Sequence, residues 1–289
     1  MTNRGRFVVV AVGLIGAVSV TSCGQVSRQP LASSAGGTRQ PGAALTPAFT
    51  DASPFYGTPA FDYADGAAGI VAPRAHAVGT FTAAQVAGAY KTVKELLVAS
   101  ALDQPTLHGE RPADFGGLLI KQQRTWFYAH LSQPVRPKAG PPWLTRTWVT
   151  AFAPDAALVG GVIKVTGEPM TASAIHVSGR LALQVTASYL FVYPMEQVGH
   201  PASRIRIVEH LQAMVQFARW DDPGGSLEPW VYEFGGSFAG AQCGHADGFI
   251  HPAFPATGTG SVQPSGNPVD PYSLGTPVSK AACQATTGT

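Results

Sequence analysis

Two stretches of sequence decide the fold: LALQVTASYLFVY at residues 181–193 and IRIVEHLQAMVQF at residues 205–217. In both, apolar side chains fill the odd-numbered positions, with Glu209 as the exception, and polar ones occur at even-numbered positions. A period of two is typical of a strand, whose successive side chains point to opposite faces. One apolar and one polar face predict an antiparallel sheet packed on one side.

Further strands and turns are expected around these two. Gly199-His200-Pro201 predicts a turn between them. Shorter strands are predicted at Leu144–Phe152, Val162–Ala172 and Trp230–Phe238.

Two helices are predicted ahead of the strands. Thr82 and Gln85 have the spacing of a capping box, and apolar residues then recur at helical spacing until about Asp103. A second helix is expected from Asp114 to His130, although Gly116 and Gly117 weaken it. Helices followed by long antiparallel strands predict one α+β domain over residues 49–255, with two helices packed on a long, curved antiparallel sheet.

This order of elements resembles the NTF2-like cone, and no shared motif supports the resemblance. It implies that the sheet wraps around the helices and encloses a pocket.

The first 22 residues have the features of an export signal. Arg4 and Arg6 precede the apolar run Phe7–Val20, which is short for a membrane span. The run ends Val20-Thr21-Ser22-Cys23, which resembles the lipobox of bacterial lipoproteins. The resemblance implies a lipid on Cys23 and a place on the extracytoplasmic face of the cell membrane. The alternatives are an ordinary signal peptide with a coincidental cysteine and an uncleaved anchor helix.

Segments of low complexity flank the domain. Residues 23–48 are rich in Gly, Ser, Gln, Pro and Ala and predict a flexible tether. The strip at residues 49–63 is rich in aromatic side chains, and it either packs onto the domain or docks a partner. Residues 256–289 form a tail rich in Gly, Pro, Ser and Thr, which we expect a disulfide to tie back.

The net charge and the motif search limit the classes of function that this chain could have. The two leader arginines account for the excess of 19 Lys and Arg over 17 Asp and Glu, so the remainder is neutral, which argues against nucleic-acid binding. Gly235-Gly236-Ser237-Phe238-Ala239 fails the nucleophile-elbow pattern at its last position. No cofactor-binding motif occurs in the sequence, and we expect the protein to have no cofactor. We therefore favour a non-catalytic module that binds a small hydrophobic ligand or an envelope protein; the alternative is an envelope enzyme, hydrolase-like, without a motif.

Glu209 is the candidate ligand-binding residue. It lies among apolar positions of its strand, and a buried carboxylate must pair, become protonated or meet water. Arg146, Lys164 and Arg180, on neighbouring predicted strands, are candidate partners. Alternatively, a bulge after Ile207 turns Glu209 to solvent.

A weaker candidate for metal binding is the trio His245, Asp247 and His251 in a glycine-rich loop. Two imidazoles and a carboxylate suit Zn²⁺ or a similar ion. Because loop residues of these types are more often solvated or capping turns, no metal is predicted.

Replacing Cys23 with Ala should move the protein from the detergent phase to the aqueous phase in a phase-partition experiment. The diacylglycerol that we expect on Cys23 carries two acyl chains, which anchor stably, whereas one chain anchors only marginally. If wild type and Cys23→Ala partition identically into detergent, the lipoprotein interpretation is wrong.

Cys243 and Cys283 should form a disulfide, because they are the two thiols that remain once Cys23 is acylated. The bond would close a loop of about 40 residues and stabilise the fold by at most roughly 4 kcal/mol. Thiol counting under denaturing, non-reducing conditions should find neither thiol free. Two free thiols per chain would contradict the prediction.

Overall fold

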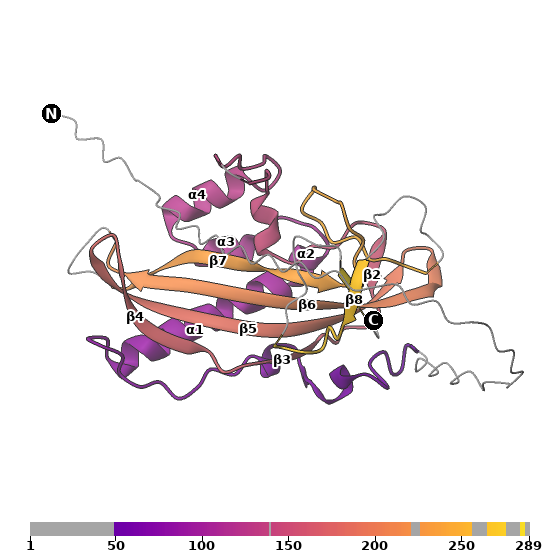
Figure 1. Ribbon diagram of the computed structural model, residues 1–289, viewed down its shortest axis with the longest axis horizontal. Helices are drawn as coiled ribbons and strands as arrows, with labels where there is room; N and C mark the ends of the chain where they lie inside the picture. Colours follow the sequence, from indigo (N-terminus) through magenta and orange to yellow (C-terminus); the bar gives the residue numbers. More distant parts are fainter. Residues whose placement is uncertain (1–48, 139, 221–225, 256–264, 276–283, 287–289) are drawn as a thin grey trace, which may run out of the picture. The chain divides into compact units, whose positions relative to one another are not determined.

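The two long strands form one hairpin at the centre of the sheet (Figure 1). The computed structural model describes residues 49–138, 140–220, 226–255, 265–275 and 284–286. Strand β5 (Arg180–Gln197) pairs with β6 (His200–Ala218) in an unbroken register from Leu183 opposite Phe217 to Glu196 opposite Arg204. The predicted alternation is confirmed, since the odd-numbered side chains between those ends are buried on one face, with Ile205 partly buried.

Five other strands extend this hairpin to a seven-stranded antiparallel sheet within the described ranges. On the side of β6 lies β7 (Glu228–Ala239). The other edge of β5 pairs successively with β2 (Ala156–Leu158), β3 (Lys164–Gly167) and β4 (Thr171–Val177). Strand β1 (Ala64–Asp65) pairs with β3, and β8 (Ser265–Val269) with β9 (Gln284–Thr286) forms a separate parallel pair.

Two of the shorter predicted strands differ from the structure. Val162–Ala172 contains β3 and the start of β4, separated at Glu168-Pro169-Met170, where proline offers no amide to the ladder. Leu144–Phe152 is not a strand: it holds the 3-10 helix η3 (Thr145–Trp148), and its alternating apolar residues pack under the helices. The predicted strand Trp230–Phe238 is confirmed as β7.

Four α-helices in the described part of the chain lie on the inner face of the sheet (Figure 1). The first, α1 (Ala83–Ala101), begins at the predicted capping box of Thr82 and Gln85. The others are α2 (Gln104–Leu107), α3 (Ala113–Leu118) and α4 (Lys121–Ala129).

The predicted second helix is thus divided into α3 and α4. The break falls at Leu119 and Ile120, which are both extended. A Cβ at Gly116 would overlap the Tyr128 hydroxyl, so a better helix former there would displace the Tyr128 side chain. The Arg124 guanidinium donates to the carbonyls of Gly117 and Leu119 and satisfies the end of α3.

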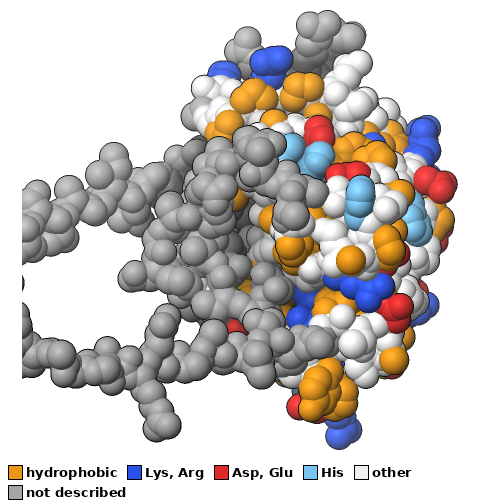
Figure 2. Space-filling model, turned by 90° about the vertical axis from the view of Figure 1, so that its right-hand side faces the viewer, with side chains coloured by type: hydrophobic (Ala, Val, Ile, Leu, Met, Phe, Trp, Pro, Cys, Tyr) orange, Lys and Arg blue, Asp and Glu red, His pale blue; other side chains and the backbone are white. Residues whose placement is uncertain are grey.

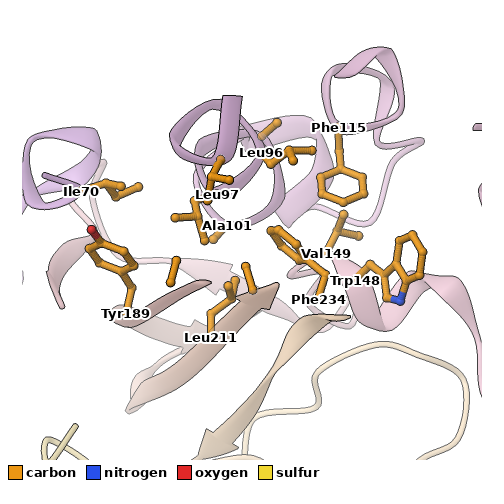
Figure 3. Close-up of a cluster of buried hydrophobic side chains, with 14 of the residues drawn as sticks. Ile70, Leu96, Leu97, Ala101, Phe115, Trp148, Val149, Tyr189, Leu211 and Phe234 are labelled. Atoms are coloured by element: carbon orange, nitrogen blue, oxygen red, sulfur yellow. The ribbon is translucent and has the colours of Figure 1, made fainter. Parts of the chain in front are cut away.

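The main core lies between the helices and the inner face. Figure 3 shows Leu97 and Ala101 of α1 above Leu211 of β6, with Phe115 and Phe234 beside them. Each fully buried leucine or phenylalanine side chain stabilises the fold by about 1.5–3 kcal/mol relative to an exposed one.

A smaller core covers part of the outer face. Phe55 and Ala60 of the strip at residues 49–63 pack with Tyr272 on an apolar patch formed by Leu190, Val192, Val208 and Ala239. The strip therefore packs onto the domain. It contains the 3-10 helix η1 (Pro59–Asp62) and is followed by η2 (Gly66–Gly69).

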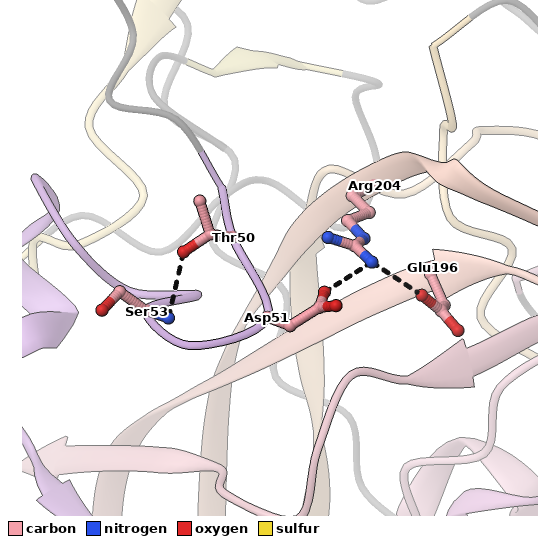
Figure 4. Close-up of polar contacts among 5 residues, drawn as sticks. All are labelled: Thr50, Asp51, Ser53, Glu196 and Arg204. Atoms are coloured by element: carbon pink, nitrogen blue, oxygen red, sulfur yellow. Dashed lines mark hydrogen bonds and ion pairs between the residues drawn. The ribbon is translucent and has the colours of Figure 1, made fainter.

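Polar contacts fasten the start of the strip. Arg204 of β6 lies between Asp51, at 2.5 Å, and Glu196 of β5, at 3.4 Å (Figure 4). The neighbouring Arg206 donates to the Pro54 carbonyl at 2.6 Å. The hairpin thus binds the helices on its inner face and the strip on its outer face.

Candidate functional site

Glu209 lies inside the domain, with 1% of its surface exposed. It faces Phe191 across the hairpin, and the register irregularity with β7 falls only after Met214, so no bulge turns it outward. Its Oε2 accepts hydrogen bonds from Thr150 Oγ1 at 2.7 Å and Tyr193 Oη at 2.8 Å. These hydroxyls supply the polar environment that a buried carboxylate requires.

The hydrogen-bond network of Glu209, Thr150 and Tyr193 connects three parts of the domain. Tyr193 Oη also lies 3.0 Å from the carbonyl of Ala101, at the end of α1. Burial, and then the charge of Glu209, raise the pKa of Tyr193 well above its usual value, so its hydroxyl keeps its proton. The network ties the sheet to α1 and to the segment after η3.

The cations expected to pair with Glu209 contact other groups. Lys164 pairs with Asp65 at 2.7 Å, and Arg180 donates to the carbonyls of Arg219 and Trp220. Arg146 donates to the Gly109 carbonyl and lies over a phenylalanine ring. The expectation that one of them pairs with Glu209 is corrected: hydroxyl groups hold the carboxylate.

Close packing surrounds the carboxylate. A Cβ at Gly236 of β7 would overlap Glu209 Oε1. The Glu209 side chain therefore occupies the space that a larger residue at position 236 would need. The role of Glu209 as a ligand anchor stays a prediction.

Two surface grooves lie near the break between β3 and β4. The edge groove has a volume of about 360 Å³ and lies between the segment around η2 and the edge of the sheet. Its walls include Tyr63, Ala68, Val71, Val165, Glu168 and Tyr189. The outer groove, of about 260 Å³, lies over the polar face of β5 and β6 and includes Thr186, Ser188 and Gln212.

Ser188 and His210 form a pair beside the outer groove that the sequence analysis missed. Ser188 Oγ lies 2.7 Å from His210 Nε2, and His210 is 4% exposed. In the hairpin, Ser188 faces Gln212 and Leu190 faces His210, so the two are diagonal neighbours on one face. Only the register, set by the turn after Gln197, reveals this pair.

His245, Asp247 and His251 converge in the loop that follows β7. One ligand atom from each lies within 4.8 Å of the others. His251 Nε2 is 2.9 Å from Asp247 Oδ2, and the His245 ring stacks on the His251 ring at 3.8 Å. Figure 2 shows a face of the molecule on which histidine side chains lie near acidic ones.

Neighbouring groups hold the Asp247 carboxylate in its ionised form. Partial burial raises its pKa, but the amide of Phe249 and the imidazoles of His251 and His245 outweigh burial, and the net pKa is below the usual value. The guanidinium of Arg146 is close enough for the Asp247 charge to act on it.

The cysteine predictions fall largely outside the described residues. Cys243 is disulfide-bonded. Cys23 and Cys283 lie outside the described ranges, as do residues 1–22 and 23–48, so the lipid anchor and the pairing of Cys243 with Cys283 stay predictions.

Comparisons with models of protein families, with curated proteins and with solved structures find no match to this chain. The resemblance to the NTF2-like cone stays a prediction. Among the helices described, none is long and apolar enough to cross a membrane.

Replacing Glu209 with Leu should lower the free energy of unfolding by more than about 1 kcal/mol, because the hydroxyls of Thr150 and Tyr193 would lose their buried acceptor. Chemical denaturation of the full chain measures this. Gln212→Leu, on the exposed face of the same strand, is the matched control and should shift stability by about 0.5 kcal/mol or less. Equal effects of the two substitutions would remove Glu209 from the network.

Proposed function

We propose that this chain is an exported lipoprotein, held on the outer face of the cell membrane by a lipid on Cys23, whose domain binds without catalysing a reaction. The lipobox-like ending of the leader supports the anchor. The sequence between Cys23 and the strip is of the composition that serves as a flexible tether. We infer that its partner is a small hydrophobic ligand, with an envelope protein as the other kind of partner.

The edge groove carries this proposal. Its volume of about 360 Å³ falls within the range of about 300–1,000 Å³ typical of small-molecule sites. The main core is filled by apolar side chains, and the buried carboxylate of Glu209 has hydroxyl partners. A surface groove is therefore a better candidate for binding than the interior.

The edge groove presents both apolar and polar groups to a ligand. Val71 at its rim is 63% exposed, and the rings of Tyr63 and Tyr189 contribute aromatic surface. Tyr189 Oη is engaged by the Val71 carbonyl at 3.2 Å. Asp62 and Glu168 add two acidic groups to the lining, which would favour a hydrogen-bond donor or a positive charge at one end of the ligand.

A second candidate function is an envelope hydrolase, and the Ser188–His210 pair favours it. A serine hydroxyl within hydrogen-bond reach of an imidazole is the first requirement of a nucleophile and its general base. The outer groove beside Ser188 would hold the substrate.

Replacing Ala68 with Trp should fill the edge groove, because Ala68 is an exposed part of its lining. Natively purified full chain, analysed by mass spectrometry, should retain a small apolar molecule, and Ala68→Trp should retain at least ~10-fold less, which corresponds to a loss of about 1.4 kcal/mol in binding. Val198→Trp, at an exposed site outside both grooves, is the control and should retain the wild-type amount.

Two outcomes would contradict the proposal. Equal ligand content in wild type and Ala68→Trp would exclude the edge groove as the binding site. Ester turnover by the wild-type chain that is lost in Ser188→Ala and kept in Ser173→Ala would establish the hydrolase instead.

A further inference from the structure

We propose that His245, Asp247 and His251 form a site for a divalent transition-metal ion of the zinc type, in the loop between β7 and β8. The inference is independent of the proposed function. It depends on the convergence of the three side chains, on the rigidity of the loop and on the groups that orient the ligand atoms.

The loop is fastened to the domain on both sides of His251. Ile250 is buried, its amide donates to the Ala151 carbonyl at 2.8 Å, and its carbonyl accepts from Ala153 at 2.9 Å. The chain then returns alongside its own start, since the amide of Gln242 donates to the His251 carbonyl at 2.7 Å. These bonds fix the backbone of His251 and bring the residues after Gln242 towards it.

The distances suit a metal centre once the stacked rings of His245 and His251 rotate apart, so that both ring planes point to one ion. Zinc–nitrogen bonds of about 2.1 Å place the ligands of a tetrahedral site about 3.4 Å apart. The three candidate atoms already lie within 4.8 Å of one another, and His251 Nε2 and Asp247 Oδ2 are 2.9 Å apart. An ion would take the place of the proton that this imidazole and carboxylate share.

Neighbouring groups select the atoms left for the ion. Gln242 Oε1 lies 3.2 Å from His245 Nε2, so the tautomer that donates to Gln242 presents Nδ1 as a ligand. The amide of Phe249 occupies Asp247 Oδ1 at 3.0 Å and leaves Oδ2 facing His251. Metal-binding histidines are commonly oriented by such an outer hydrogen bond.

The ligand set determines which ion would bind. Two neutral imidazoles and one carboxylate suit zinc and neighbouring transition metals better than Ca²⁺ or Mg²⁺, which prefer oxygen ligands. Because His245 and Asp247 are exposed, water would complete the coordination. The nearby positive charge of Arg146 opposes the ion and would lower the affinity.

The alternative is that the trio only stabilises the loop through the bond between His251 and Asp247. Metal binding distinguishes the two. The full chain, solubilised in detergent, free of histidine tags and stripped with a chelator, is titrated with Co²⁺ and followed by visible absorption; Zn²⁺ binding is measured by calorimetry. We expect saturation at one equivalent and displacement of Co²⁺ by Zn²⁺.

The variants give the residue-level test. His245→Ala and Asp247→Asn should each weaken Zn²⁺ binding by about 100-fold, and Gln242→Leu by about 10-fold, as for losses of ligands and of their orienting partners. His76→Ala, an exposed histidine elsewhere in the chain, should leave the affinity unchanged. Thermal unfolding without metal verifies that each variant folds. Absence of saturable binding in the folded wild type, or unaltered affinity in folded His245→Ala and Asp247→Asn, would overturn the proposal.

Discussion

The register of the hairpin formed by β5 and β6 is the constraint on which the rest of the structure depends. Side chains alternate between faces, so a slip of one residue would exchange the whole apolar set with the polar set. The observed register, with Phe191 opposite Glu209, presents apolar side chains to the four helices and carries Glu209 into the core. The same register places Ser188 and His210 together on the outer face.

The carboxylate of Glu209 is buried and hydrogen-bonded within the domain, whereas the candidate binding sites lie on its surface. An isolated charge in the core would cost several kcal/mol, but Thr150 and Tyr193 offset that cost by hydrogen bonding, and Gly236 makes room for the group. With that carboxylate enclosed, the candidate binding sites lie at the surface: the edge groove, the outer groove, and the loop of His245, Asp247 and His251. The strip at residues 49–63 covers an apolar patch on the outer face.

Periodicity made the α+β class, the hairpin strands, α1 and the interior position of Glu209 predictable. The division between α3 and α4 was not, because the break falls at Leu119 and Ile120, two apolar residues that give no stop signal in the sequence. The segment at Leu144–Phe152 alternates like a strand, yet its apolar residues serve a 3-10 turn under the helices. Loops have no period, so the sequence indicated the types of His245, Asp247 and His251 but not their convergence. The partners of Glu209 were predicted wrongly. We expected positively charged residues, whereas the partners are the uncharged hydroxyls of Thr150 and Tyr193, which do not stand out in a sequence.

The most direct measurement is NMR of the deuterated full chain in detergent, for nuclear Overhauser contacts between main-chain protons across β5 and β6. The account predicts contacts that pair Phe191 with Glu209 and Tyr189 with Leu211. It also predicts slow hydrogen exchange along both strands, because their amides lie beneath the helices and the strip. Contacts of Glu209 with Leu190 or Val192 as its facing residue would contradict the register, and with it the interior carboxylate and the Ser188–His210 pair.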